Sequence, residues 1–264
     1  MINQVKDPAI EVHNLTVSYS GSPVLWGVDF TVPKGELVGI IGPNGSGKTT
    51  LLKSIMNLVE PGGGYIKIFD QSLQNVRDRI SYVPQRETVD WDFPASVLEV
   101  VLMGRYSSKN ILKRLTKTDH ELAWDALKKV GMTDFANRQI AQLSGGQQQR
   151  VFIARALARQ SELFLLDEPF TGVDAASEEA ILTLLGQMKQ EGKTILVVHH
   201  DLQTAKAYFD WIILLNTRLI ASGKKDDVFQ SDLLQQAYGG RLTLLSKVGD
   251  LLKEEHFPIR EDKI

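Results

Sequence analysis

Residues 37–50 read LVGIIGPNGSGKTT, and this stretch decides the fold. The run LVGII is short, apolar and contains valine and isoleucine, which predicts a strand buried on both faces. The segment LLKSIMNLV, which directly follows this stretch, has the apolar spacing of a helix. Between them, Gly42, Gly47, Lys48 and Thr49 fit the pattern G-x-x-x-x-G-K-[ST]. The order of strand, glycine loop and helix predicts an α/β domain with a phosphate-binding loop.

The chemistry of this loop follows from its residue types. Glycines let backbone N–H groups turn toward a polyphosphate, and the helix N-terminus adds the positive end of its dipole. Lys48 offers charge to the terminal phosphates, and Thr49 offers a hydroxyl to Mg²⁺. A flexible glycine-rich turn is the alternative, but the flanking strand and helix favour a nucleotide site. The predicted binding residues are Gly42, Pro43, Asn44, Gly45, Ser46, Gly47, Lys48, Thr49 and Thr50.

Composition narrows the possible partners. The chain has 264 residues, of which 43% are hydrophobic, enough for one large domain or a domain with an inserted subdomain. Thirty basic and 32 acidic residues give a formal charge of -2, so no nucleic-acid partner is expected. The absence of cysteine excludes disulfides, thiolate metal sites and cysteine nucleophiles, and it fits a reducing compartment such as the cytoplasm.

The sequence shows no membrane-spanning or export signal. Its longest apolar runs are four or five residues, far below the roughly 20 that cross a bilayer. The opening residues MINQVKDPAIEVHNL lack the apolar segment of a signal peptide. We therefore expect any membrane contact to be made through a partner.

The rest of the chain alternates between strand and helix patterns. The first third has strand and turn patterns, helical patterns dominate residues 93–159, and strands return in LFLL, TILVV and WIILLN. A helix between LFLL and TILVV implies a parallel sheet with right-handed crossovers. Within the helical region, Thr118 and Glu121 fit a capping box for a helix that ends at Gly131. The helical region is thus predicted to be an insertion into a sheet domain.

A second cluster of polar residues follows the predicted strand LFLL. Asp167 and Glu168 fall at its carboxyl end, where ligands gather in open parallel sheets. Asp167 suits the Mg²⁺ shell, and Glu168 could orient and deprotonate an attacking water. A solvated turn ended by Pro169 is the alternative, but the phosphate loop favours the catalytic interpretation.

Two histidines follow the predicted strand TILVV. Successive side chains of an extended segment point to opposite faces, so His199 and His200 are not expected to share a ligand. One of them could face the phosphate, although each taken alone reads as a surface histidine.

The stretch LSGGQQQR at residues 143–150 combines two signals. Ser144 and Gln147 fit a capping box that starts a helix. Gly145 and Gly146 then each cost about 1 kcal/mol relative to alanine in the first turn, which helix stability does not explain. They are understandable if a phosphate must approach the backbone of this helix start closely.

Taken together, these residues resemble the ATP-binding subunit of an ATP-binding-cassette (ABC) transporter over nearly all of residues 8–240. The D-loop reads TGVD rather than the commoner S-x-L-D form, and Asp174 is retained. The matching motifs are GPNGSGKTT as Walker A, Gln85 in YVPQ as the Q-loop, Leu143, Ser144, Gly145, Gly146 and Gln147 as the signature, LFLLDEP as Walker B, Asp174 as the D-loop and His200 as the switch histidine.

The resemblance implies an α/β fold of the P-loop NTPase class and the ABC ATPase type. Such a fold has a mainly parallel core sheet, an N-terminal antiparallel β subdomain and an inserted helical subdomain. The expected divisions are an ATPase domain at residues 1–240, with the helical subdomain at about 93–159, and a C-terminal tail at residues 241–264.

The resemblance also implies a composite site for ATP and Mg²⁺. Two copies would pair head to tail, with ATP between the Walker A loop of one and the signature of the other. Tyr19 would stack on adenine, Glu168, His200 and Gln85 would act in catalysis, and Thr49, Gln85 and Asp167 would hold Mg²⁺.

The resemblance further implies membrane partners. The chain would lie on the cytoplasmic face of the cell membrane, held by integral membrane permease subunits, with an extracytoplasmic solute-binding protein completing the system. Residues 87–106 resemble the corresponding segment of importers for divalent metals, with manganese the first choice, then zinc or iron.

Three alternatives to metal import remain at this stage. The WDFP sequence within residues 87–106 could simply pack the helical insertion. The chain could serve an importer for an iron chelate or another small solute. A soluble mechanical ABC ATPase of translation or DNA repair is more remote, because such chains usually carry tandem cassettes, long coiled-coil insertions or basic surfaces.

Overall fold

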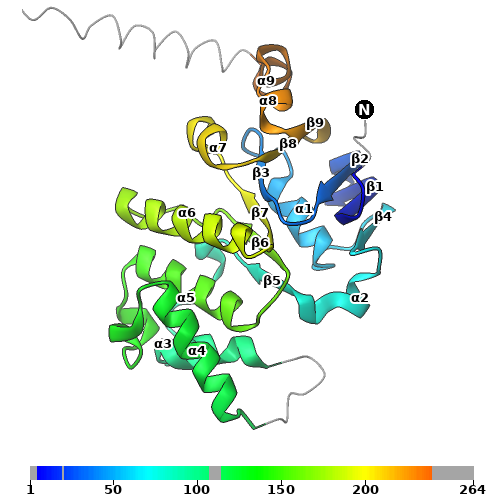
Figure 1. Cartoon of the computed structure of the whole chain (residues 1–264). Coiled ribbons are helices and arrows are strands. Elements are labelled where there is room, and N and C mark those ends of the chain that lie inside the picture. Colours follow the sequence, from blue (N-terminus) through cyan, green and yellow to red (C-terminus); the bar gives the residue numbers. More distant parts are fainter. Residues whose placement is uncertain (1–4, 20, 107–113, 240–264) are drawn as a thin grey trace, which may run out of the picture.

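The computed structural model describes residues 5–19, 21–106 and 114–239, and these form two sheets with helices around them (Figure 1). A three-stranded antiparallel sheet has the order β2-β1-β4, and a six-stranded sheet has the order β5-β6-β7-β3-β8-β9. The strands are β1 (Pro8–Tyr19), β2 (Ser22–Pro33), β3 (Leu37–Ile41), β4 (Gly63–Ile68), β5 (Ile80–Val83), β6 (Leu163–Asp167), β7 (Thr194–Val198), β8 (Trp211–Asn216) and β9 (Arg218–Lys224).

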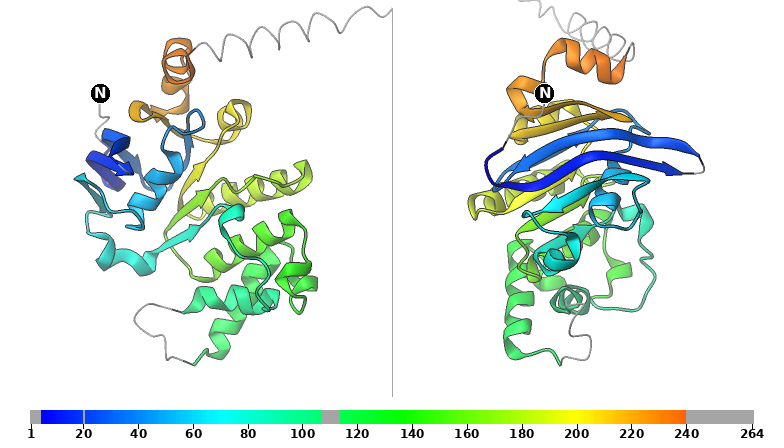
Figure 2. Two further views of the ribbon diagram at one scale, coloured as in Figure 1. Left: turned by 180° about the vertical axis from the view of Figure 1, so that it is seen from behind. Right: turned by 90° about the vertical axis from the view of Figure 1, so that its right-hand side faces the viewer.

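Helices cover the sheets and form a separate layer at one end. The green helices α3, α4 and α5 lie together, away from the blue strands of the antiparallel sheet (Figures 1 and 2). The helices are α1 (Lys48–Ile55), α2 (Leu73–Val76), α3 (Val97–Leu102), α4 (Lys117–Lys129), α5 (Gly145–Ala158), α6 (Ala175–Gln190), α7 (Leu202–Tyr208), α8 (Lys225–Val228) and α9 (Ser231–Tyr238).

The predicted strand LVGII is β3, and all five of its residues are buried. It pairs in parallel with β7 on one side and β8 on the other. Leu37 and Ile41 belong to one buried cluster and Val38 and Ile40 to another, so both faces of the strand are covered. At Gly39 an added Cβ would overlap the ring of Phe209, which explains a glycine inside a central strand.

The parallel registers bring distant residues to one edge of the large sheet. Val198 of β7 lies opposite both Asp167 of β6 and Ile40 of β3. The loop after β3, the residues after β6 and the histidines after β7 therefore emerge side by side at the carboxyl edge. Only β9 pairs antiparallel in this sheet, so the predicted, mainly parallel core is confirmed.

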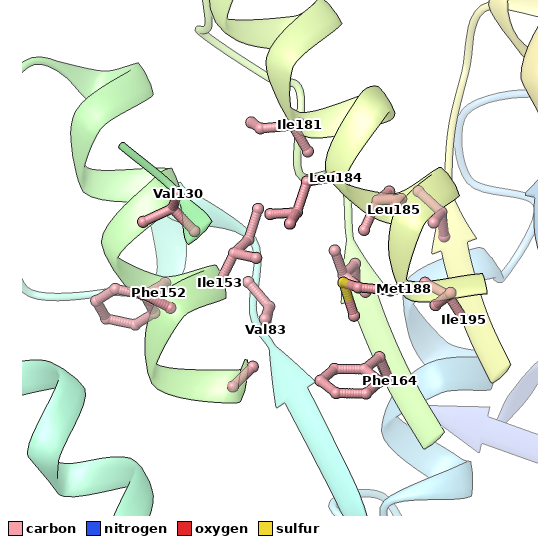
Figure 3. Close-up of a cluster of buried hydrophobic side chains, with 14 of the residues drawn as sticks. Val83, Val130, Phe152, Ile153, Phe164, Ile181, Leu184, Leu185, Met188 and Ile195 are labelled. Carbon is pink, nitrogen blue, oxygen red and sulfur yellow. The ribbon is translucent and has the colours of Figure 1, made fainter. Parts of the chain in front are cut away.

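The larger core lies between the sheet and the helical layer. Ile153 of α5 and Leu184 of α6 point toward one another, close to Val83 of β5, whereas Phe152 points away from α6 (Figure 3). Phe152 and Ile153 come from α5, while Leu184 and Met188 come from α6, and all four are at least 94% buried. This apolar contact fixes α5 and the segment before it relative to the end of β6.

The predicted capping box of the helix α4 was wrong in position. The helix begins after Thr116, whose backbone N–H donates to Asp119 Oδ2 at 2.9 Å, while Asp119 N–H donates to Thr116 Oγ1 at 3.3 Å. Asp119 also accepts a 2.9 Å bond from Arg105, and this buried partner favours a start two residues before Thr118. Glu121 is exposed and faces Lys117 instead.

Other helix boundaries agree with the sequence patterns. Gly131 has φ of 65°, the left-handed conformation expected just after the end of α4. The capping box of Ser144 and Gln147 is present at the start of α5. The predicted tail at residues 241–264 lies outside the described residues, within which no helix combines the length and apolar character needed to cross a bilayer.

The corrected cap predicts a difference between two threonines that are two residues apart. Thr116→Ala removes the side chain that caps α4 and is expected to lower the free energy of unfolding by about 1 kcal/mol. Thr118→Ala, which removes no cap, is expected to change it by less than about 0.5 kcal/mol. Urea unfolding followed by circular dichroism compares the two variants. An equal loss in both would contradict the assigned helix start.

Candidate active site

The phosphate-binding loop joins β3 to α1, and its backbone angles and close contacts require glycine at several positions. Gly45 and Gly47 have φ of 80° and 97°, which non-glycine residues rarely adopt. An added Cβ at Gly42 would overlap the carbonyl oxygen of Leu215. Gly47 is the N-cap of α1, so the backbone turns sharply into the helix. The loop thus has the strand, tight turn and helix N-terminus that the sequence predicts.

Lys48 lies at the start of α1 with its ammonium folded across the loop. Its Nζ donates to the carbonyl oxygens of Gly42 at 2.9 Å and Pro43 at 3.0 Å. Burial lowers the pKa of Lys48, while the carboxylates of Glu168 and Asp167 act in the opposite direction. A positive charge is therefore held beside the loop with little solvent around it.

Asp167 ends β6 and is 99% buried. Its Oδ1 accepts a 2.8 Å bond from the Thr49 hydroxyl, and its Oδ2 accepts a 3.3 Å bond from the Tyr82 hydroxyl. Burial raises the pKa of Asp167, and the bond from Thr49 opposes that shift. A hydroxyl and a carboxylate side by side are the oxygen donors that Mg²⁺ prefers, so this pair fits that ion.

Glu168 directly follows Asp167 but points elsewhere. Its φ is 48°, a left-handed conformation that costs a non-glycine residue roughly 1–3 kcal/mol. Its Oε2 accepts bonds from Thr171 Oγ1 at 3.1 Å and from Gln85 Nε2 at 3.3 Å. The sharp turn separates two adjacent carboxylates, one toward Thr49 and one toward Gln85.

A cavity of about 490 Å³ joins most of these groups, while Gly42, Pro43 and Asp167 are not among the residues that line it. It collects residues from five separate stretches of the chain. Four of them follow strands of the large sheet at its carboxyl edge, and the fifth, Val24, comes from β2 of the antiparallel sheet. Its lining residues are Val24, Asn44, Gly45, Ser46, Gly47, Lys48, Thr49, Thr50, Gln85, Glu168, Thr171 and His200. Ser46 also contributes a buried hydroxyl without a hydrogen-bond partner among the described residues, as expected where a polar ligand binds.

The two histidines after β7 have different surroundings. His200 is exposed and lines the cavity, whereas His199 is 97% buried, with its ring against Phe170 at 5.2 Å and Phe209 at 6.0 Å between centroids. Burial lowers the pKa of His199 to about 4. His200 is therefore the one that can face a phosphate.

Some predicted site residues lie outside this cavity. Tyr19 ends β1 with 46% of its surface exposed and is not part of the lining, so its contact with adenine stays a prediction. Leu143, Ser144, Gly145, Gly146 and Gln147 lie at the start of α5, and Asp174 caps α6; none of them lines the cavity.

Comparison with known proteins decides the family. A family model described as "ABC transporter" matches residues 25–171, more than half of the chain. The chain belongs to the ABC transporter family. It is therefore an ATP-binding, ATP-hydrolysing subunit with the ABC ATPase fold.

Individual relatives extend the match beyond the core motifs. The manganese transport system ATP-binding protein MntB of Bacillus subtilis is 58% identical over 236 residues, covering 89% of this chain and 94% of that protein. The zinc transport system ATP-binding protein TroB of Treponema pallidum is 52% identical over 235 residues, covering 89% and 88%.

Among solved structures, the chain is similar to a dimeric ATP-binding cassette in a post-hydrolysis state bound to ADP and phosphate. The identity is 31%, the TM-score is 0.71, and the alignment covers 82% of this chain and 98% of that one.

The signature of this ABC ATPase packs against the start of α6 and against the loop residues Gly172 and Arg86 of its own chain. An added Cβ at Gly146 would meet Ser177 Oγ at 3.0 Å, and one at Gly145 would meet Gly172 O at 3.1 Å and Arg86 Nε at 3.2 Å. Asp174 fixes this arrangement, because its Oδ1 accepts from Ser177 N–H at 3.0 Å. Close packing within one chain is thus one reason for both glycines.

Three residues of the ABC ATPase site were missed from sequence. Tyr82 holds Asp167, Thr171 holds Glu168, and Val24 lines the cavity. Tyr82 lies three residues before Gln85 on the same strand and turn, and Thr171 lies three residues after Glu168, so proximity to the motifs was the available signal. Val24 carried none, because it reads as ordinary strand packing.

The buried His199 predicts a pH dependence of stability. The pKa of His199 is about 4 in the folded chain, against 6.5 in the unfolded chain. The stability that depends on a neutral imidazole at this position is therefore fully present above pH 6.5, and it is lost as the pH falls toward 4. His199→Leu is therefore expected to reduce the loss of unfolding free energy between pH 7 and pH 5 by about 2 kcal/mol. Urea unfolding at both pH values measures this.

The exposed neighbour provides the matched control. His200→Gln keeps the buried imidazole of His199 and removes only a neighbouring charge, which lowers the His199 pKa less than burial does, so it is expected to change the pH dependence less than His199→Leu. A His199→Leu variant with the same pH dependence as the unsubstituted chain would show that burial of this imidazole does not carry the effect.

Proposed function

We propose that this chain is the ATP-hydrolysing subunit of an importer for a divalent metal ion, with manganese the first choice, then zinc or iron. The observation that carries the ATPase part is the single cavity shared by the phosphate loop, Gln85, Glu168 and His200. The relatives named for manganese and zinc transport, at 58% and 52% identity over 89% of this chain, support the cargo class.

ATP binds in the cavity through the phosphate loop. Backbone N–H groups of residues 44–47 and the Lys48 ammonium hold the phosphates, and Tyr19 is assigned to stack on the adenine. Thr49, Asp167 and Gln85 hold Mg²⁺, which when bound offsets the negative charge of the phosphates.

Hydrolysis needs a positioned water. Glu168 orients and deprotonates this water, and the bonds from Thr171 and Gln85 fix the direction of its carboxylate. His200, which follows the neighbouring strand β7 at the same edge of the sheet, holds the γ-phosphate. The left-handed turn at Glu168 is the strained backbone expected where geometry serves catalysis.

A second copy of the chain completes the site in a head-to-tail sandwich. Ser144 is exposed at the helix start, outside the cavity of its own chain, and is therefore free to bind the γ-phosphate held by the partner. Asp174 and the D-loop, packed against the same glycines, belong to the same face. The dimeric solved relative bound to ADP and phosphate supports this arrangement.

The permease docks on the segment after Gln85. Two large hydrophobic side chains are exposed there, Met103 at 45% and Tyr106 at 42%. No group of three or more histidine and carboxylate side chains gathers as a metal site in the part of the chain that the structure describes. The cargo ligands are accordingly assigned to integral membrane permease subunits and an extracytoplasmic solute-binding protein.

This assignment gives the chain a peripheral place on the cytoplasmic face of the cell membrane, without a nucleic-acid partner. Residues 1–240 form the ATPase domain, with the helical subdomain at about 93–159, and residues 241–264 form a tail.

Uptake of radioactive manganese tests the cargo. Cells that lack this chain are expected to lose high-affinity manganese uptake and to regain it when the chain is restored. Retained manganese uptake with loss of zinc, iron or iron-chelate uptake would replace manganese with that solute. Recovery of the chain with ribosomes or DNA, and never with a membrane protein, would overturn the transporter assignment.

Glu168→Gln provides the chemical control for the same experiment. It is expected to bind ATP normally but to hydrolyse it slower by a factor of about 10² or more, the scale of general-base catalysis, and so to fail to restore uptake. Normal turnover by this variant, measured as phosphate release, would remove Glu168 from its assigned role.

A further inference from the structure

Arg86 connects the Q-loop to the signature helix. It follows Gln85 at the end of β5 and is the first residue of a short 3-10 turn, Arg86–Thr88. Its guanidinium donates two hydrogen bonds to Gln148 Oε1, from Nε at 3.1 Å and from Nη2 at 3.0 Å. Gln148 is 97% buried in α5, where its Nε2 donates to the Ile140 carbonyl at 3.2 Å. The acceptor is therefore held in place by a second bond and is shielded from solvent.

The same guanidinium covers the first signature glycine. A Cβ at Gly145 would lie 3.2 Å from Arg86 Nε and 3.3 Å from its Cζ. The glycine is thus the surface on which the arginine rests, with Gly172 of the D-loop against it as well. A shift of Arg86 would change the packing at the turn that presents Ser144.

The segment after Gln85 has a further attachment to α5. Trp91 Nε1 donates to the Arg86 carbonyl oxygen at 2.9 Å, and the Trp91 ring lies 4.8 Å from that of Phe152 between centroids. Residues 86–91 therefore contact α5 near its start through Gln148 and one turn later through Phe152. Such a clamp favours movement of this segment and α5 as one body.

Arg86 is also linked, through Gln85, to the carboxylate of Glu168. Gln85, joined to Arg86 by one peptide bond, donates from Nε2 to Glu168 Oε2 at 3.3 Å. Arg86 is itself outside the cavity lining, so it touches neither the phosphate loop nor a nucleotide bound there. It lies between a group that serves its own chain's ATP and a motif that serves the partner's.

We propose that Arg86 is a positioning residue that couples the two composite ATP sites by locking Gln85 to the start of the signature helix. The inference rests on the proposed head-to-tail sandwich. When Gln85 is drawn toward bound nucleotide in one site, the clamp carries Ser144 and Gly145 with it, which aligns them for the phosphate of the other site.

The variant that tests this must remove the link without leaving a buried polar group unpaired. Arg86→Met alone keeps a long side chain packed against Gly145 but leaves the buried Gln148 Oε1 without a hydrogen-bond donor, which destabilises the fold. The double variant Arg86→Met/Gln148→Leu removes both polar partners, a change that can be nearly neutral for stability. Its melting temperature is expected to match that of the parent chain.

A second arginine provides the matched control. Arg79 precedes β5 as Arg86 follows it, and it also donates two hydrogen bonds to one side chain, Glu162, both at 2.7 Å. It lies at the opposite end of the strand from Gln85 and outside the cavity lining. Arg79→Met/Glu162→Leu therefore removes another two-bond arginine link, an exposed one, without touching the coupling.

Three measurements on the full chain separate coupling from folding. Affinity for a fluorescent ATP analogue, at protein concentrations too low for pairing, is expected to be unchanged by the double variant. In a Glu168→Gln background, ATP-dependent dimerisation by sedimentation is expected to weaken about tenfold or more, within the usual range of coupling between sites. With Glu168 intact, kcat is expected to fall by a similar factor. The Arg79 control should match the parent in all three.

The conservative variant provides a rescue. Arg86→Lys, which keeps the charge and can donate to Gln148 from one nitrogen, is expected to fall between the parent and the double variant in dimerisation and kcat. Normal dimerisation and kcat in Arg86→Met/Gln148→Leu would overturn the inference. A Glu168→Gln parent that stays monomeric with ATP would instead overturn the proposed sandwich, and this inference with it.

Discussion

The hydrogen bond from Thr49 to Asp167 is the contact on which the site depends. It joins residues 118 positions apart in the sequence over 2.8 Å, the first on α1 after the phosphate loop and the second at the end of β6. The bond forms because β3 and β6 run in parallel in one sheet, with β7 between them. It brings an oxygen pair suited to Mg²⁺ beside the loop, and the left-handed turn at Glu168 then directs the next carboxylate toward Thr171 and Gln85.

The signature glycines answer to two demands at once. The sequence pattern alone explains them by the close approach of a phosphate, because two glycines weaken a helix start. The structure adds a demand within the chain, since side chains at Gly145 and Gly146 would press on Arg86, Gly172 and Ser177. Both demands concern the same turn, so packing that holds this turn can also determine how well it meets the partner's phosphate.

The parts of the fold that sequence predicts are those with strong local patterns. LVGII is a buried strand because it is apolar on both faces, and the helix start at Ser144 follows from its own side chains. The sequence pattern predicted a helix start at Thr118 instead of Thr116. The contact that favours Thr116, from Arg105 to Asp119, joins separate elements and has no local pattern. The edge strand β9 went unnamed because its partly exposed residues RLIASGK follow no clear period.

The residues of the site likewise fall into those that local motifs predict and those that only the folded chain brings together. Lys48, Thr49, Asp167 and Glu168 stand in motifs that short spacing defines. The bond from Tyr82 to Asp167 and the clamp from Arg86 to Gln148 span 85 and 62 residues, and no local pattern indicates such pairings. They arise only once β5, β6 and α5 are packed together.

The central claim, that one chain holds half of each ATP site, can be tested by cross-linking between chains. The chain has no cysteine, so Asn44→Cys within the phosphate loop and Gln142→Cys beside the signature, both exposed positions, would be the only thiols. In a Glu168→Gln background with ATP and Mg²⁺, a short bis-maleimide should join Asn44→Cys chains to Gln142→Cys chains, and neither type to itself. Failure to join the two types, or joining that does not need ATP, would contradict the account.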